Sequence, residues 1–332
     1  MPAPLSRHRL QHRQGVPPDD PAIAAVQVSV VIATYNRAHL LKGTLEALAS
    51  QAVPDSLKWE IVVVDNNSRD TTAQVVTAFS KTTATPVRYV FESEPGVSRA
   101  RNRGIREARG SIIAFTDDDV LPAPDWIAQL VAAIDRWNAH GVGGRILPRW
   151  ETSPPLWLTD SRYLCNRLAI MDCESSRLLA LPVEAQPQVW GANMAFRREL
   201  LESVGGFDPQ LGGIGKRLFR GEETDLIKRA LGLGLKIAYD AGLTVFHRIG
   251  SDRMRKIYFC RLEFDSAQGE AHGRPATRRS FLGAPLWSYR RAFTDFWKWV
   301  GLVLLRRPGA FDQQLASFRS AGELSGYWKA GR

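Results

Sequence analysis

Residues 28–137 alternate between short apolar runs and longer amphipathic stretches, which leaves few folds open. The apolar runs predict strands at 28–33, 61–64, 87–91 and 111–115. The stretches after them predict helices at 39–51, 70–79, 97–108 and 124–137. Strands that alternate with helices of ten or so residues are typical of βαβ units. We therefore expect an α/β fold with a Rossmann-like, mostly parallel central sheet flanked by helices.

The alternation breaks down after a further predicted strand at 142–146. Residues 148–187 are irregular and contain several prolines, which is more typical of a functional loop than of a scaffold. Regular structure resumes with predicted strands at 189–196, 236–239 and 244–246 and predicted helices at 198–204 and 221–231. We expect three parts, namely a disordered basic leader at 1–25, a main domain at 26–250 and a helical extension at 251–332.

The cysteines, the first residues and the apolar runs of the chain indicate the cellular compartment of the protein. Three cysteines, Cys165, Cys173 and Cys260, have neither an even count nor metal-site spacing, so we expect a reducing compartment and no disulfide framework. The first 20 residues are polar and basic and have no apolar centre of the secretory kind. No run approaches the ~20 apolar residues that a membrane span needs. These features predict a cytoplasmic protein.

The turn after the first predicted strand excludes two nucleotide-binding motifs. It reads Thr34-Tyr35-Asn36-Arg37 and contains no glycine. A dinucleotide-binding turn needs G-x-G-x-x-G, and a P-loop needs G-x-x-x-x-G-K-[ST]. If a nucleotide binds, its phosphates must be neutralised by other groups.

Acidic residues follow the second and fourth predicted strands. Asp65 ends one, and Asp117, Asp118 and Asp119 end the other. Ligands of open α/β sheets bind beyond the carboxyl ends of the strands. Three adjacent acids repel one another unless a positive group lies among them, and a hard divalent cation is the simplest candidate. The alternatives are that the triplet is a solvated turn and that Asp65 only caps the turn after it.

The ordered set of motifs resembles the inverting GT-A glycosyltransferases of family 2, which use nucleotide sugars. The resemblance covers residues 27–250. It rests on the segments Val28–Arg37, Val62–Ser68, Gly96–Gly110, Phe115–Asp119, Trp190–Phe196, Gly205–Asp208 and Gly221–Leu226. Any one of these motifs is weak, but together they occur in order and at the expected spacing.

The resemblance implies a donor site and a metal. The residues it assigns to the nucleotide sugar are Thr34, Tyr35, Asp65, Arg101, Asp117 and Asp118. Asp117 and Asp119 match the family's D-x-D motif and, with His247, would hold Mg²⁺ or Mn²⁺. The metal would act as a Lewis acid when the nucleoside diphosphate departs. A UDP-sugar is the favoured donor.

The resemblance also implies a base and an acceptor side. An inverting transfer needs a carboxylate that takes the proton of the acceptor hydroxyl. The family has a Glu-Asp pair at the start of a late helix, and here the pair is Glu222-Glu223, so Glu223 is the expected base. Asp225 is the reserve candidate. Trp190, Asn193 and Glu222 are expected on the acceptor side.

The last quarter of the chain carries most of the positive charge. Residues 251–332 contain 15 Lys and Arg against 7 Asp and Glu, and the whole chain has a formal net charge of +10. Within it, Phe293, Phe296, Trp297, Val300 and Leu304 recur at helical spacing. This pattern suits a helix at a membrane surface, or one packed on the domain or on a partner. No nucleic-acid module accompanies the charge, so we expect no nucleic-acid partner.

Together with the resemblance, these features predict a cytoplasmic, peripherally membrane-bound enzyme. The resemblance implies that it would transfer a sugar to a saccharide or lipid-linked saccharide hydroxyl in envelope or exopolysaccharide synthesis. The main alternative is a non-catalytic sugar-binding or scaffolding subunit of a polysaccharide assembly. A metal-dependent nucleotidyltransferase would need more basic residues around the phosphates than the motifs supply.

Overall fold

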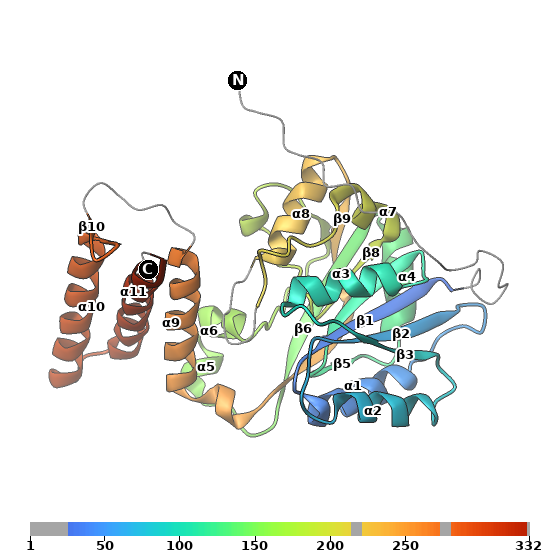
Figure 1. Cartoon of the computed structure of the whole chain (residues 1–332), viewed down its shortest axis with the longest axis horizontal. Coiled ribbons are helices and arrows are strands. Elements are labelled where there is room, and N and C mark those ends of the chain that lie inside the picture. The colour runs from blue at the N-terminus through green and yellow to red at the C-terminus, as the bar shows by residue number, and fades with distance from the viewer. Residues whose placement is uncertain (1–25, 214–220, 273–279, 331–332) are drawn as a thin grey trace.

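The computed structural model describes residues 26–213, 221–272 and 280–330, so the predicted leader at 1–25 lies outside the described residues. A large sheet forms its centre, with α3, α7 and α8 above it and α1 and α2 below it in Figure 1. The strands are β1 (Val28–Thr34), β2 (Trp59–Asp65), β3 (Val87–Phe91), β4 (Ile112–Asp117), β5 (Val120–Pro122), β6 (Gly141–Trp150), β7 (Arg177–Leu178), β8 (Met194–Arg197) and β9 (Ile237–Ile249). The helices around it are α1 (Ala38–Ala49), α2 (Thr72–Ser80), α3 (Val97–Glu107), α4 (Trp126–Arg136), α7 (Arg198–Val204) and α8 (Glu222–Gly232).

The strand order is β3-β2-β1-β4-β8-β6-β9-β5, with β7 beside β9. Strands β3, β2, β1 and β4 run parallel, whereas β8 runs antiparallel to both β4 and β6. Strand β6 is parallel to β9, and the short strands β5 and β7 are antiparallel to β9. The predicted α/β class and mostly parallel central sheet are confirmed, with antiparallel strands in the second half.

The register of the parallel strands brings the predicted strand ends together. Thr34 pairs with Asp65 across β1 and β2, and Ala33 pairs with Asp117 across β1 and β4. The runs before these ends are almost wholly buried, as expected for strands covered by helices on both faces. The hydrophobic core thereby fixes the position of polar groups at one edge of the sheet.

Several predicted elements differ from those observed. The strand expected at 189–196 is limited to β8, because residues 191–193 form a turn and a bend. The strands expected at 236–239 and 244–246 are one strand, β9, whose pairing with β6 shifts register between Gly144 and Arg145. The irregular stretch at 148–187 contains α5 (Leu156–Thr159), α6 (Arg162–Arg167), β7 and the 3₁₀ turn η1 (Val183–Ala185).

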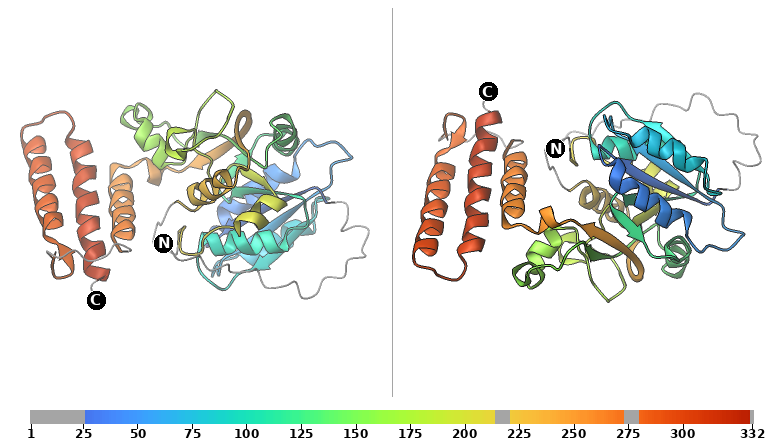
Figure 2. Two further views of the ribbon diagram at one scale, coloured as in Figure 1. Left: turned by 90° about the horizontal axis from the view of Figure 1, so that it is seen from above. Right: turned by 90° about the horizontal axis from the view of Figure 1, so that it is seen from below.

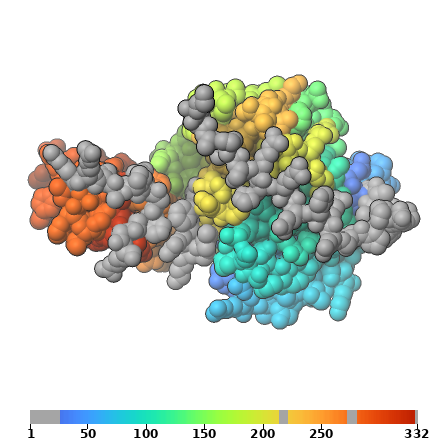
Figure 3. Space-filling view, turned by 45° about the horizontal axis from the view of Figure 1, so that its top comes forward, coloured from blue at the N-terminus to red at the C-terminus, as the bar shows by residue number. Residues whose placement is uncertain are grey.

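Beyond β9 the chain forms a helical extension. It comprises η2 (Ser251–Met254), α9 (Lys256–His272), the hairpin strands β10 (Ser280–Phe281) and β11 (Ala284–Pro285), α10 (Leu286–Leu304) and α11 (Ala310–Ala330). The three long helices stand side by side with α11 between α9 and α10 (Figures 1 and 2). Figure 3 shows the extension as a lobe joined to one side of the main body.

A second hydrophobic core attaches this extension. It joins Leu164 of α6 to Ile249 at the end of β9, Phe259 of α9 and Leu315 of α11. Trp157 of α5 packs edge-on against Phe259 and Phe311. Helix α10 contributes no buried residue to this core and instead packs on α11. In the described part of the chain, no helix is long and apolar enough to cross a membrane.

Candidate active site

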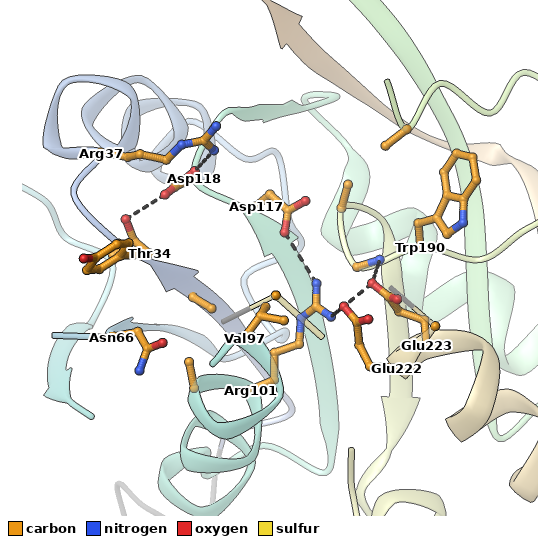
Figure 4. Close-up of a pocket in the computed structure, with 18 of the residues that line it drawn as sticks. Thr34, Arg37, Asn66, Val97, Arg101, Asp117, Asp118, Trp190, Glu222 and Glu223 are labelled. Atoms are coloured by element: carbon orange, nitrogen blue, oxygen red, sulfur yellow. Dashed lines mark hydrogen bonds and ion pairs between the residues drawn. The ribbon is translucent and has the colours of Figure 1, made fainter. Parts of the chain in front are cut away.

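A pocket of about 900 Å³ opens at the carboxyl ends of β1 and β4 (Figure 4). Because β1 continues to β2 on one side and has β4 on the other, this is the point where the strand order reverses. Such points are the usual ligand sites of open α/β sheets. The polar side chains that line the pocket are Thr34, Tyr35, Arg37, Asn66, Asn67, Arg101, Asp117, Asp118, Asn166, Trp190, Glu222, Glu223 and Thr224.

Asp118 is held by the turn after β1. Thr34 Oγ1 donates to its Oδ2 at 2.7 Å, and Arg37 Nη1 donates to its Oδ1 at 2.8 Å. The hydroxyl of Thr44 in α1 donates to its backbone carbonyl at 2.9 Å. Burial raises the pKa of this carboxyl to about 6, although Arg37 opposes the shift. Asp118 thus ties β1 and α1 to the end of β4.

Asp119 faces His247, away from the lining of the pocket. The antiparallel pairing of β5 with β9 sets Val120 opposite His247, which brings the preceding residue beside the imidazole. Nε2 of His247 lies 3.4 Å from Oδ2 of Asp119. Arg37 and Arg253 reach the same oxygen at 3.0 and 3.3 Å, and Arg253 Nη1 also lies 3.0 Å from His247 Nε2. Burial would raise the pKa of Asp119, but His247 and the two arginines hold it below its usual value.

The three predicted metal ligands are not gathered in one cluster. Within the described residues, no group of three or more His, Cys, Asp or Glu side chains is arranged to hold a metal. Asp117 turns toward Arg101, whereas Asp119 and His247 lie together. His247 Nδ1 is buried and has no hydrogen-bond partner in the described part of the chain. A carboxylate beside an imidazole suits a divalent ion that keeps positions for phosphate and water, so Asp119 and His247 fit the expected metal and Asp117 does not join them.

Arg101 of α3 connects the acids on opposite walls of the pocket. Its Nη1 lies 3.0 Å from Oε1 of Glu223 and 3.1 Å from Oε1 of Glu222. Its Nη2 lies 3.7 Å from Oδ1 of Asp117, and its guanidinium stacks over the ring of Phe207. The family resemblance assigned this residue to the nucleotide sugar. The structure buries Arg101 among three carboxylates (Figure 4).

Glu222 and Glu223 begin α8, where the positive end of the helix dipole favours acids. Oε1 of Glu223 also accepts the backbone N–H of Gly191 at 3.1 Å. Oε2 of Glu222 is buried and has no partner among the described residues. Burial and the neighbouring Glu223 raise the pKa of Glu222 to about 7. Glu222 therefore takes up a proton more readily than an ordinary glutamate, and protonation of Glu222 leaves the charge of Arg101 to Glu223 and Asp117.

Besides Asp119 and His247, three further predicted residues, Asp225, Asn193 and Asp65, do not line the pocket. Asp225, the reserve base, pairs with Arg229 of its own helix at 2.7 Å. Asn193, expected on the acceptor side, is fully buried, and its amide accepts from the indole of Trp126 and donates to the carbonyls of Arg145 and Leu243. It is a framework residue, because all its polar atoms are used inside the protein.

Asp65 also has its carboxylate engaged within the protein. It accepts from the backbone N–H of Ser68 at 2.8 Å and from the hydroxyl of Tyr89 at 2.8 Å. This is the turn-capping arrangement considered as its alternative role. Its neighbours Asn66 and Asn67 line the pocket instead, together with the exposed Tyr35. Trp190 lines the opposite side, in the loop before β8.

Arg37 and Arg253 were not predicted from the sequence as partners of the strand-end acids. Arg37 directly follows the turn after β1, so its position at the acidic edge was a usable signal. Arg253 lies in η2, six residues beyond His247, and no sequence pattern connects it to Asp119. The hydrogen bond from the backbone N–H of Gly191 to Glu223 could not be predicted from the sequence either, because only the fold brings that loop to α8.

The sheet order and the position of the pocket are those of a GT-A-like α/β protein. Residues 29–205, more than half of the chain, match the family model described as Glycosyl transferase family 2. The chain therefore belongs to glycosyltransferase family 2.

Relatives and solved structures agree with this assignment. Glycosyltransferase AglE of Haloferax volcanii is 30% identical over 213 residues, and the match spans 64% of each chain, just under two thirds of AglE. Succinoglycan biosynthesis protein ExoM of Rhizobium meliloti is 25% identical over 91% of this chain and 93% of its own. Mannosyltransferase PcManGT from Pyrobaculum calidifontis, solved with GDP-Man and Mn²⁺, has a TM-score of 0.58 at 21% identity over 91% of this chain and 87% of that one. At 21% identity, this structural similarity shows a shared fold alone.

Proposed function

We propose that this protein is an inverting glycosyltransferase that moves a sugar from a nucleotide-diphosphate sugar to a hydroxyl of a saccharide or lipid-linked saccharide. One observation carries the proposal. The pocket at the switch point has Asp117 and Asp118 on one wall and Glu222 and Glu223 on another, and Arg101 bridges the two groups. Clustered acids with shifted pKa values that face a pocket are more typical of a functional site than of a purely structural one.

The two walls support different parts of the transfer. Asp117 and the turn after β1 lie where a donor would enter at the strand ends, and Glu223 lies across the pocket from them. We assign Glu223 as the base that takes the proton of the acceptor hydroxyl while its oxygen attacks the anomeric carbon. The bond from that carbon to the diphosphate oxygen breaks on the opposite face, so the configuration inverts. Arg101 and the N–H of Gly191 hold the Glu223 carboxylate in place.

A divalent ion, Mg²⁺ or Mn²⁺, would be held by Asp119 and His247 and would supply Lewis-acid stabilisation of the departing diphosphate. The Mn²⁺ in the PcManGT complex supports this use of a metal. Arg253 and Arg37 contact the Asp119 oxygen that faces His247 and neutralise this carboxylate.

The donor and the acceptor follow from the family resemblance. We favour a UDP-sugar, bound by Tyr35, Thr34 and the Asp65–Asn67 turn. ExoM, a succinoglycan biosynthesis protein, supports an acceptor in polysaccharide synthesis. A lipid-linked acceptor would be presented at a membrane, so we place the enzyme on the cytoplasmic face of one as a peripheral protein.

Calorimetric titration of the protein with UDP, GDP and dTDP, with and without Mn²⁺, tests this proposal. We expect metal-dependent binding of UDP. Preferential binding of GDP would retain the transferase but change its donor. If a folded protein bound none of the three, the non-catalytic scaffolding function would be favoured instead.

A further inference from the structure

Helix α10 is the outermost helix of the extension and lies farthest from the central sheet (Figures 1 and 2). One side of it packs on α11. There Ser288 is buried, Trp287 meets the ring of Tyr327 edge-on, and Arg291 pairs with Glu323 at 3.4 Å. On the side of the helix directed away from α11, no described residue packs against it. Helix α10 is therefore packed on α11 on one side and exposed on the other. The sequence alone had left open whether it lies at a membrane surface or packs on the protein.

The outward side of α10 carries a line of large apolar residues. Leu286, Phe293, Trp297 and Leu304 are 54%, 66%, 54% and 76% exposed. They follow one another at steps of seven, four and seven residues, each close to a whole number of helical turns, so they form one stripe along the helix. A continuous exposed stripe of this kind marks an interaction surface, whereas single exposed apolar residues do not.

Unpaired cations accompany the stripe. Arg290 and Lys298 are exposed beside it, and Arg306 and Arg307 follow the end of the helix. None of these four side chains has an ion pair or a hydrogen bond with another described residue, whereas Arg291, on the α11 side, has two acidic partners. The acid within α10, Asp295, accepts from Gln313 and pairs with Arg291. The outward side thus combines aromatic and aliphatic groups with uncompensated positive charge.

The combination of exposed apolar groups and unpaired positive charge favours one kind of binding partner. A second copy docked symmetrically on this face would bring the same unpaired cations of both chains together, which is unfavourable. An anionic lipid surface supplies headgroup charge for the arginines and lysine, and an interfacial region for tryptophan and phenylalanine. Because α10 cannot span a bilayer, its contact with lipid has to be lateral.

We propose that the stripe Leu286–Phe293–Trp297–Leu304 of α10 lies in the surface of an anionic lipid bilayer, with Arg290, Lys298, Arg306 and Arg307 on the headgroups. The binding itself needs only this helix. That it brings the pocket near a lipid-linked acceptor rests on the proposed function. Removal of α10 and α11 would be a poor test, because Leu315 of α11 belongs to the second core. Substitutions on the exposed stripe avoid that damage.

Sedimentation of the full chain with vesicles provides the test. We expect binding to vesicles of equal parts phosphatidylglycerol and phosphatidylcholine, little binding to phosphatidylcholine alone, and weakening as salt screens the charges. Phe293→Glu combined with Trp297→Glu should weaken binding at least about tenfold, and Arg290→Glu with Lys298→Glu should do so at low salt. Leu156→Glu, at a residue 75% exposed on α5, is the matched control and should bind as the unmodified chain does.

Two results would overturn the proposal. One is vesicle binding that none of the α10 substitutions changes. The other is a stable dimer in light scattering that Phe293→Glu with Trp297→Glu dissociates, without vesicle binding by the unmodified chain. Nucleotide titration of the same double variant separates the two proposals, since donor binding should be unchanged even where lipid binding is lost.

Discussion

Nη1 of Arg101 lies 3.0 Å from Oε1 of Glu223, which ties α3 on one side of the pocket to the start of α8 on another. The guanidinium is almost inaccessible to solvent, and the pair therefore interacts in a poorly screened environment. The same arginine reaches Asp117 at the end of β4. One cation thus sets the spacing between the donor-side acid and the proposed base.

Replacing Arg101 with alanine should destabilise the protein strongly. Three carboxylates would lose their buried counter-charge, and breaking such a buried pair typically costs about 3–5 kcal/mol of unfolding free energy. Urea denaturation measures this loss. Arg99→Ala on the same helix removes a partly exposed pair with Glu94 and should cost less than about 1 kcal/mol. Equal losses for the two variants would contradict the bridging role of Arg101.

Glu223→Gln should spare donor binding and reduce turnover by at least about 100-fold, because the amide cannot accept the hydroxyl proton. The amide oxygen can still accept the N–H of Gly191, so the loop should keep its position. Initial rates of nucleotide release and calorimetry with UDP measure the two effects. Asp225→Asn is the control, since Asp225 pairs with Arg229, and its turnover should stay within a few-fold. A larger loss in the control would move the base to Asp225.

Asp119→Ala should abolish the metal dependence of donor binding. The substitution removes one of the two groups that fit the ion and leaves His247 alone. Calorimetry with UDP at matched concentrations of Mn²⁺ and of a chelator measures the effect. Asp135→Ala, at an exposed residue paired with Arg197, should bind like the unmodified protein. Undiminished Mn²⁺-dependent affinity in Asp119→Ala would remove Asp119 from the metal site.

Glu222 should make the protein less stable as the pH rises. Its pKa is about 7 in the folded chain and 4.5 in the reference state, so the folded state binds the additional proton between these values. The unfolding free energy therefore falls as pH increases from about 4.5 to 7, by up to about 3 kcal/mol from this group. Glu222→Gln should remove that part of the slope. Urea denaturation at pH 5 and pH 8 tests it, and an unchanged slope would contradict the shift.

The first half of the fold could be predicted from local sequence patterns. Strands β1 to β4 and the helices between them were predicted to within a few residues, because buried parallel strands leave uninterrupted apolar runs. Strand β5 was missed, since three residues carry no periodicity. Strand β9 was predicted as two strands, because Ala241 and Gly242 interrupt the apolar pattern at the point where the pairing with β6 shifts register.

For the site, chain order alone placed Thr34 and Asp117 at one sheet edge, since neighbouring parallel strands end at the same edge. Which acid faces which partner was decided by long-range packing. Asp118 turns to Thr34 and Arg37, Asp119 to His247 through the β5–β9 register, and Asp117 to Arg101. Periodicity is a property of neighbours along the chain, whereas contacts at this site join distant segments, as in the pair of Asp119 and Arg253, 134 residues apart. Only the folded sheet and its covering helices fix such distances.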